Sequence, residues 1–205
     1  MKLGVKHGAK RATLILGAAA LLTAAPAMAG FKLMQKGQPQ LLRKSSLTVT
    51  PTIPWNRLGA RLGRNAEAWT LDGHSLNDLI FYTAIPAGKT LFREVDKKNK
   101  PLPKFDSKML APDIAALFES SYRIAGSTSL FSIDSIEPAT FAGKPGFRFA
   151  YSFTVQNEEV RRAGEATGAV INGQLYMITF EAPKIHYFDR NVEDYRALVA
   201  TAKVG

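Results

Sequence analysis

The stretch EAPKIHYFDR, residues 181–190, gathers two acids, a histidine and a tyrosine directly after an apolar run. Glu181, His186 and Asp189 are residue types that serve as general acids, general bases or metal ligands. The same stretch also has the features of a strand that ends and a helix that begins. Pro183 removes a backbone donor from a strand ladder, and Asp189 suits the first turn of a helix. We therefore interpret the stretch mainly as a connection, in which His186 alone has no structural explanation.

The alternative is a metal-dependent or hydrolytic enzyme that uses His186. Only His74 and His186 remain after the first 29 residues, whereas a catalytic zinc usually takes three protein ligands. The chain has no cysteine, which excludes disulfides, thiolate catalysis and cysteine zinc sites. Serine-hydrolase, zinc-protease, phosphate-loop and dinucleotide motifs are absent from the sequence. We therefore predict a protein that is not an enzyme, with no catalytic residue, no metal site and no cofactor.

Residues 1–29 are typical of a cleaved secretory signal peptide. Four basic residues open this segment, an apolar run of about a dozen residues follows, and Ala27-Met28-Ala29 fits the small-x-small rule for cleavage. The apolar run is shorter than the roughly 20 residues that a spanning helix needs. We expect cleavage near Ala29-Gly30, export to the periplasm or secretion, and no transmembrane anchor in the mature chain.

Positive charge is concentrated near the start of the mature chain. Seven bases precede the first acid, Glu67, whereas 16 bases and 17 acids occur from Glu67 onward. We predict that residues 30–45 form a flexible basic leader and that residues 46–205 form a single domain. Since each base near an anionic membrane contributes about 1 kcal/mol to binding, the leader predicts contact with a membrane surface through Lys32, Lys36, Arg43 and Lys44. The alternative is a solvated tail, and nucleic acid is not an expected partner.

Strand signals occur at both ends of the domain. SLTVTP, residues 46–51, alternates and is rich in β-branched residues, and Asp72-Gly73 predicts a tight turn between two apolar arms. A polar loop is expected over residues 89–108, where a binding lid would most naturally lie. Further on, GFRFAYSFTV alternates with a period of two and has aromatic residues on one face. With its neighbours, and a turn at Asn172-Gly173, it predicts a four-stranded antiparallel meander.

Two helices are expected to pack on this sheet. Apolar residues at helical spacing predict a helix from Pro112 to Ala125 and another from Val192 to Ala202, with Asn191 in a capping arrangement. The predicted fold class is therefore α+β, a single antiparallel sheet made of the early strands and the meander, packed with two main helices.

The order of these elements resembles the PsbP-like family. The resemblance rests on PWNRLG, EAWTLDG, GFRFAYSF and GQLYMITFEAP followed by HYF, and it covers roughly residues 46–204. In detail the chain is most similar to uncharacterised exported bacterial envelope proteins of this type. The resemblance implies the fold but no activity, because functions differ across the family. Some relatives bind metal, but no ligand motif of theirs matches positions here.

A strand of small residues, VRRAGEATGAVI, is the best candidate for a binding surface. Small side chains let another group approach the backbone closely. One possibility is a helix that covers this face, and the other is a shallow groove for an anionic or lipid-like ligand. The predicted groove residues are Arg148, Ser152, Arg161 and Arg162.

These observations predict an exported, non-enzymatic binding or accessory module of the bacterial cell envelope. It would contact a protein partner, an anionic membrane surface or an anionic, lipid-like ligand. The enzyme that uses His186 and a purely structural interaction protein are the alternatives. The sequence does not identify the partner or the oligomeric state.

Overall fold

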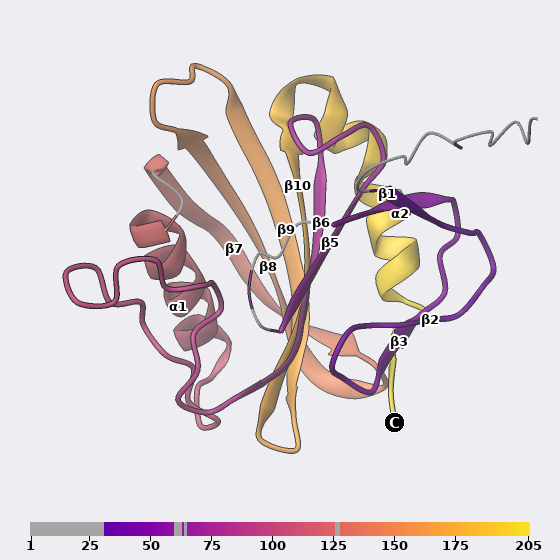
Figure 1. Ribbon diagram of the computed structural model, residues 1–205, viewed down its shortest axis with the longest axis horizontal. Coiled ribbons are helices and arrows are strands. Elements are labelled where there is room, and N and C mark those ends of the chain that lie inside the picture. Colours follow the sequence, from indigo (N-terminus) through magenta and orange to yellow (C-terminus); the bar gives the residue numbers. More distant parts are fainter. Residues whose placement is uncertain (1–30, 60–62, 64, 126–127) are drawn as a thin grey trace, which may run out of the picture.

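The computed structural model describes residues 31–59, 63, 65–125 and 128–205. Figure 1 shows one helix on each side of a central sheet. In chain order the elements are β1 (Phe31–Met34), β2 (Gln40–Leu41), β3 (Leu47–Val49), β4 (Trp55–Leu58), β5 (Ala66–Thr70), β6 (Asp78–Pro86), α1 (Ala111–Ala125), β7 (Thr128–Phe141), β8 (Lys144–Val155), β9 (Arg161–Ile171), β10 (Gln174–Pro183), η1 (Lys184–Phe188), α2 (Asp189–Val199) and β11 (Lys203–Val204).

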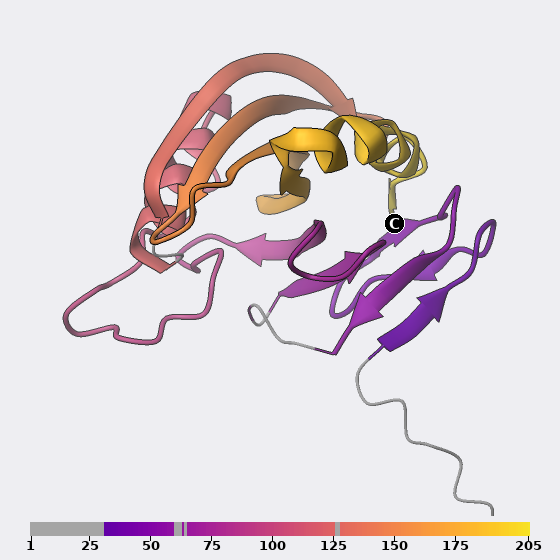
Figure 2. The same cartoon turned by 90° about the horizontal axis from the view of Figure 1, so that it is seen from above.

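Eight strands form the main sheet, in the order β1-β4-β5-β6-β10-β9-β8-β7, and neighbouring strands are antiparallel. The predicted meander is confirmed as β7 to β10, and the arms on either side of Asp72-Gly73 are β5 and β6. Asn172 and Gly173 have φ values of 51° and 74°, as a tight hairpin turn requires. Figure 2 shows how the long strands β7 and β8 arch across the molecule.

One core lies between α1 and the sheet. The predicted helix is confirmed as α1, where Asp113 Oδ2 accepts a hydrogen bond from Leu110 N at 2.9 Å and so satisfies a donor at the start of the helix. The aromatic face of β8 is buried beneath this helix, as the alternation predicted. The residues that make up this face are Phe147, Phe149, Tyr151 and Phe153.

A second core lies on the opposite face, between the sheet and α2. It contains the largest aromatic side chains of the early strands, Trp55 and Trp69, together with Phe180 and Tyr195. The second predicted helix is α2, which begins at Asp189 rather than at Val192 and ends at Val199 rather than at Ala202. The predicted cap at Asn191 is wrong, because Asn191 is buried inside the helix and Phe188 holds the capping position without a side-chain bond.

The main sheet has more strands than the sequence predicted, and a second, three-stranded sheet was not predicted. The strand predicted at residues 46–51 is β3, which does not join the main sheet. It pairs instead with β2 on one side and with β11, at the C-terminus, on the other. The alternation of β3 reflects burial, since Leu47 and Val49 both pack into the core beside α2.

The segment predicted as a flexible leader, residues 30–45, is folded where the structure describes it. Lys32 pairs with Arg57 across β1 and β4, and Met34 and Leu42 are buried in the core beside α2. Since burial of a large apolar side chain contributes about 1.5–3 kcal/mol, these two side chains are sufficient reason for the segment to be ordered. The predicted signal peptide lies outside the described residues.

Candidate functional site

The four predicted groove residues are divided between the two faces of the sheet. Arg148, Ser152 and Arg161 lie on the face that carries α2, where Arg161 Nη2 donates to Ser152 Oγ at 2.8 Å. Arg162 lies on the other face, and its Nη1 donates to the carbonyl oxygen of Ser75 at 3.0 Å. Successive residues of a strand point to opposite faces, so Arg161 and Arg162 cannot share one rim. The single rim that the sequence predicted is not formed.

The small residues of β9 are explained by the neighbouring aromatic strand. Gly164 lies opposite Tyr151, and a Cβ at Gly164 would lie 2.1 Å from a ring carbon of Tyr151. Ala166 lies opposite Phe149 in the same way. The group that approaches this strand closely is therefore a tyrosine ring, on the α1 face.

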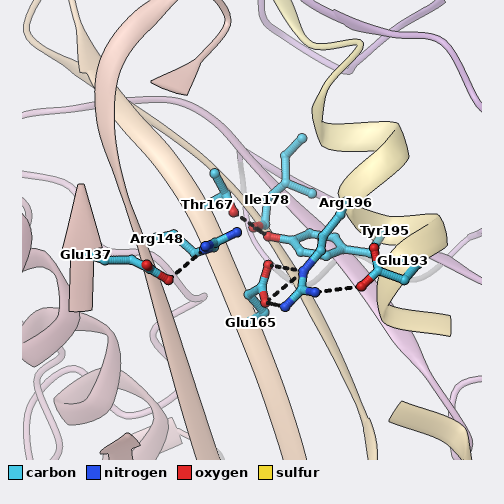
Figure 3. A network of polar contacts seen from close by, with 8 residues as sticks. All are labelled: Glu137, Arg148, Glu165, Thr167, Ile178, Glu193, Tyr195 and Arg196. Carbon is cyan, nitrogen blue, oxygen red and sulfur yellow. Dashed lines mark hydrogen bonds and ion pairs between the residues drawn. The ribbon is translucent and has the colours of Figure 1, made fainter. Parts of the chain in front are cut away.

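On the α2 face, β9 carries a network of paired charges (Figure 3). Arg196 of α2 donates through Nε to both carboxylate oxygens of the buried Glu165, at 3.1 and 3.2 Å, and through Nη1 to Glu193 at 2.6 Å. Arg148 donates through Nε to Glu137 at 2.8 Å. A cavity of about 330 Å³ lies between these groups, lined by Arg148, Glu165 and Arg196 among others. Since both arginines already have carboxylate partners, this cavity offers an anion little unpaired charge.

Glu181 is a buried carboxylate on the α1 face. Tyr122 of α1 donates to its Oε2, and Tyr151 donates to the same oxygen at 3.1 Å. Asp78 lies directly opposite Glu181 across β6 and β10, and it too is buried. Burial raises the pKa of Glu181 to about 7, although the bond from Tyr122 and the charge of Arg162 oppose the rise. Glu181 therefore exchanges its proton near neutral pH, and it lines none of the cavities described in this section.

Neither histidine forms a metal site with its described neighbours. His74 is exposed, and its Nδ1 lies 2.8 Å from Asp78 Oδ1. Burial raises the pKa of Asp78, and His74 opposes this rise. His186 is exposed in η1 with φ of 72°, and its carbonyl oxygen accepts the backbone N–H of Asp189. No group of three or more acids, histidines or cysteines that could hold a metal occurs in the described part of the chain.

The candidate site is a cavity of about 440 Å³ beside the end of β6. Its apolar wall consists of Ala84, Ile85, Pro86 and Phe92, and the first three come from the irregular end of the strand. Phe92 is held edge-on by Tyr82, with ring centroids 5.9 Å apart. A volume in this range and a largely apolar wall are typical of small-molecule sites.

A bulge in β6 creates this cavity wall. The register with β10 shifts between Leu175 and Met177, and Ala84 adopts φ of 50°, a conformation that costs an alanine about 1–2 kcal/mol. Asn65 compensates, since its Nδ2 donates to the carbonyl oxygens of Thr83 and Ala84, both at 3.0 Å. Bulges of this kind are frequent beside functional sites, where they redirect side chains.

Three cations surround the cavity without a carboxylate partner. Lys44, Lys89 and Arg93 line it, and none of them forms an ion pair with a described residue. Glu94 is the one acidic residue among the lining residues that the structure describes. The balance of charge at the cavity is therefore positive, in contrast to the paired network on the α2 face. This arrangement can hold an anion against an apolar wall.

Lys44 belongs to the predicted membrane-surface set, and the structure brings it to the cavity from the segment that follows β2. Lys32, Lys36 and Arg43 are all exposed, and none of them lines the cavity. Two of the other bases counted near the N-terminus, Arg61 and Arg64, lie outside the described residues.

Lys89 and Arg93 were not among the predicted site residues. Both come from the loop over residues 89–108, where a candidate lid was predicted. Leu91 and Phe105 are buried, so the loop is anchored to the core at two points. The available signal was the combination of basic residues with these apolar anchors.

Comparison with known proteins gives the fold. No family model matches the chain, and no curated protein matches it in sequence. The solution structure of cyanobacterial PsbP (CyanoP) from Synechocystis sp. PCC 6803 is similar, with a TM-score of 0.53 and 14% identity, over 93% of this chain and 99% of that one. No helix among the described residues is both long and apolar enough to cross a membrane.

Two further solved structures are more distant. A protein from Bacteroides thetaiotaomicron VPI-5482 matches with a TM-score of 0.49 and 9% identity, over 83% of this chain and 49% of that one. LpqN, involved in cell envelope biogenesis of Mycobacterium tuberculosis, matches with a TM-score of 0.33 and 10% identity, over 82% and 84%. These likenesses are too weak to carry an argument. The similarity to CyanoP, together with the element order described above, shows that this chain has the PsbP-like fold.

Proposed function

We propose that this protein is a non-enzymatic binding module of the bacterial cell envelope that holds an anionic ligand in the cavity beside β6. The observation that carries the proposal is a group of three cations beside an apolar wall, Lys44, Lys89 and Arg93, that form no ion pair among the described residues. Hydrogen bonds to charged groups contribute about 1.5–3 kcal/mol each, so two or three of them give useful affinity. The signal peptide predicted from residues 1–29 supports the envelope location.

The non-enzymatic part of the proposal rests on the kind of groups at the cavity. Its titratable residues are two lysines, an arginine and Glu94, which suit electrostatic binding. Two buried acids on the α1 face, Glu181 and Asp78, do not line the cavity: Glu181 accepts from Tyr122 and Tyr151, and Asp78 is bonded to His74. Hydrolysis would need a nucleophile and a base within hydrogen-bonding reach of each other.

A second proposed role is attachment to an anionic membrane surface. β1 is an edge strand; it exposes 59% of Phe31 and 49% of Leu33 on one face, and the exposed Lys32 between them in sequence points to the other face. Exposed apolar and basic side chains together are typical of surfaces that touch lipid. The lipid-like ligand of the cavity would then come from the same surface.

The direct test is binding of ethyl phosphate by calorimetry at low ionic strength, with the protein purified from a host that exports the full chain. We expect binding by the wild type and at least a tenfold loss in a Lys44→Gln, Lys89→Gln, Arg93→Gln variant. Lys203→Gln, on β11 and outside the cavity lining, is the matched control and should bind like the wild type.

Recovery of the ethyl phosphate after incubation with the protein tests whether the protein is an enzyme. We expect ethyl phosphate to be recovered intact, whereas release of inorganic phosphate that the triple variant lacks would mean that the cavity is catalytic. Equal binding by wild type and triple variant, or none by either, would refute the cavity as an anion site.

A further inference from the structure

A second cavity adjoins the basic cavity and shares one residue with it. This second cavity has a volume of about 300 Å³ and lies between the loop after β6 and the last turn of α1. Arg93 lines both cavities, Glu94 lines only the first, and Val95 and Asp96 line only the second. One continuous stretch of the loop therefore forms a wall of each.

The second cavity is built mainly from apolar side chains. They are Val95, Leu102, Ile124 and Ala125. Leu102 is buried and Ile124 is 38% exposed, whereas Val95 is 95% exposed at the cavity, where a bound ligand would cover it. A ligand that removes these exposed apolar groups from water binds more favourably for doing so.

The charged residues at the second cavity differ from those at the first. Asp96 accepts hydrogen bonds from Asn99 N and Asn99 Nδ2, at 3.1 and 3.2 Å, so its carboxylate is occupied within the loop. Lys100 also lines the cavity, and its backbone N–H donates to the carbonyl oxygen of Asp96 at 2.8 Å. The second cavity therefore carries one further basic side chain, Lys100, beside its apolar wall, and Arg93 lies at the junction with the first cavity.

We propose that the ligand is an anionic amphiphile, whose anionic group binds among Lys44, Lys89 and Arg93 and whose alkyl chain lies against Val95, Leu102 and Ile124. This inference rests on the proposed anion-binding function and adds the class of ligand. Arg93 suits the junction because its aliphatic stem can cover a chain while its guanidinium binds the anionic group. A ligand with both an anionic group and an alkyl chain would use the cations of the first cavity and the exposed apolar residues of the second, whereas a ligand of one cavity would use only one set.

The test is a series of alkyl phosphates with two to ten carbons, each measured by calorimetry below its micelle concentration. Burial of one methylene contributes about 0.8 kcal/mol, which corresponds to about fourfold in affinity per added carbon. We expect affinity to rise over the first several carbons and then to level off once the cavity is full. Unlimited growth along the series would indicate partition onto the surface and would overturn the proposal.

Two variants separate the anionic group from the chain. Val95→Ser with Ile124→Ser should leave the affinity for ethyl phosphate unchanged but flatten the dependence on chain length. Leu130→Ser with Ile136→Ser, which changes two exposed apolar residues of β7, is the matched control and should keep the wild-type dependence.

The possible failures are distinguishable. If ethyl phosphate binds and longer chains bind no better, the anion site stands and the chain site is refuted. If no member of the series binds, the proposed function fails, and this inference fails with it. If both pairs of serine substitutions flatten the series equally, the chain does not lie in this cavity.

Discussion

Replacing Glu181 by glutamine should remove a pH dependence of stability that the wild-type protein carries. Glu181 has a pKa of about 7 in the folded protein, because burial disfavours its charged form, against 4.5 as its ordinary value. Because the pKa of Glu181 is higher in the folded than in the unfolded state, its contribution to stability is fully present below about pH 4.5. This stability is lost as pH rises through about 7. The difference between these two pKa values corresponds to about 3 kcal/mol.

The substitution isolates this contribution because glutamine is close to the protonated acid in shape and charge. Its side-chain oxygen can still accept from Tyr122 and Tyr151. The free energy of unfolding of Glu181→Gln minus that of the wild type should therefore rise by about 3 kcal/mol from pH 4 to pH 8. Other carboxylates titrate in both proteins and cancel in the comparison.

The assay is urea unfolding followed by the fluorescence of Trp55 and Trp69, which are both fully buried. Glu159→Gln, an exposed acid in the turn after β8, is the matched control and should follow the wild-type curve. Asp78 lies opposite Glu181 and also has a raised pKa, so Asp78→Asn combined with Glu181→Gln should flatten the profile further. Parallel curves for wild type and Glu181→Gln from pH 4 to pH 8 would refute the reasoning.

Other predictions follow from the bulge, from the small residues of β9 and from the N-terminal segment. Ala84→Gly should raise the free energy of unfolding by up to about 1 kcal/mol, because glycine adopts φ of 50° without strain, whereas Ala84→Val should lower it; equal denaturation midpoints would contradict this. Gly164→Ala should cost about 3 kcal/mol or more, since its Cβ would overlap the Tyr151 ring, and a wild-type melting curve would disprove the contact. N-terminal sequencing of the exported protein should begin near Gly30, and Met1 would disprove cleavage. Co-sedimentation with anionic vesicles should weaken from 0.1 M to 1 M salt, where the screening length falls from about 10 to about 3 Å, and should decrease in a variant with glutamine at Lys32, Lys36 and Arg43; binding that ignores salt would rule out the membrane role.

The long elements could be predicted because their patterns are strong and local. GFRFAYSFTV alternates strictly, so it predicted both strand β8 and its buried face. The spacing of apolar residues predicted α1 to within one residue of its start. β2 and β11 have two residues each, and neither has a pattern of its own. Their pairing with β3 depends on segments that lie far apart in the chain.

The candidate site was harder to predict because its parts come from separate segments. Lys44, Asn65 and Lys89 meet only when the bulge in β6 has formed. The bulge has no clear signal in the sequence, because an alanine occupies the left-handed position where glycine is expected. The rim predicted on β8 and β9 failed for a simpler reason, since Arg161 and Arg162 are adjacent and face opposite ways.

The pairing of β11 with β3 also determines when the protein can finish folding. Lys203 and Val204 are synthesised long after β2 and β3, yet they complete the sheet that these two strands form. β6 likewise cannot pair with β10 until β10 is synthesised, about ninety residues later. Non-local pairings of this kind form late. During synthesis, strands β1 to β6 therefore emerge before the partners that complete either sheet, so neither sheet can close until β10 and β11 have been made.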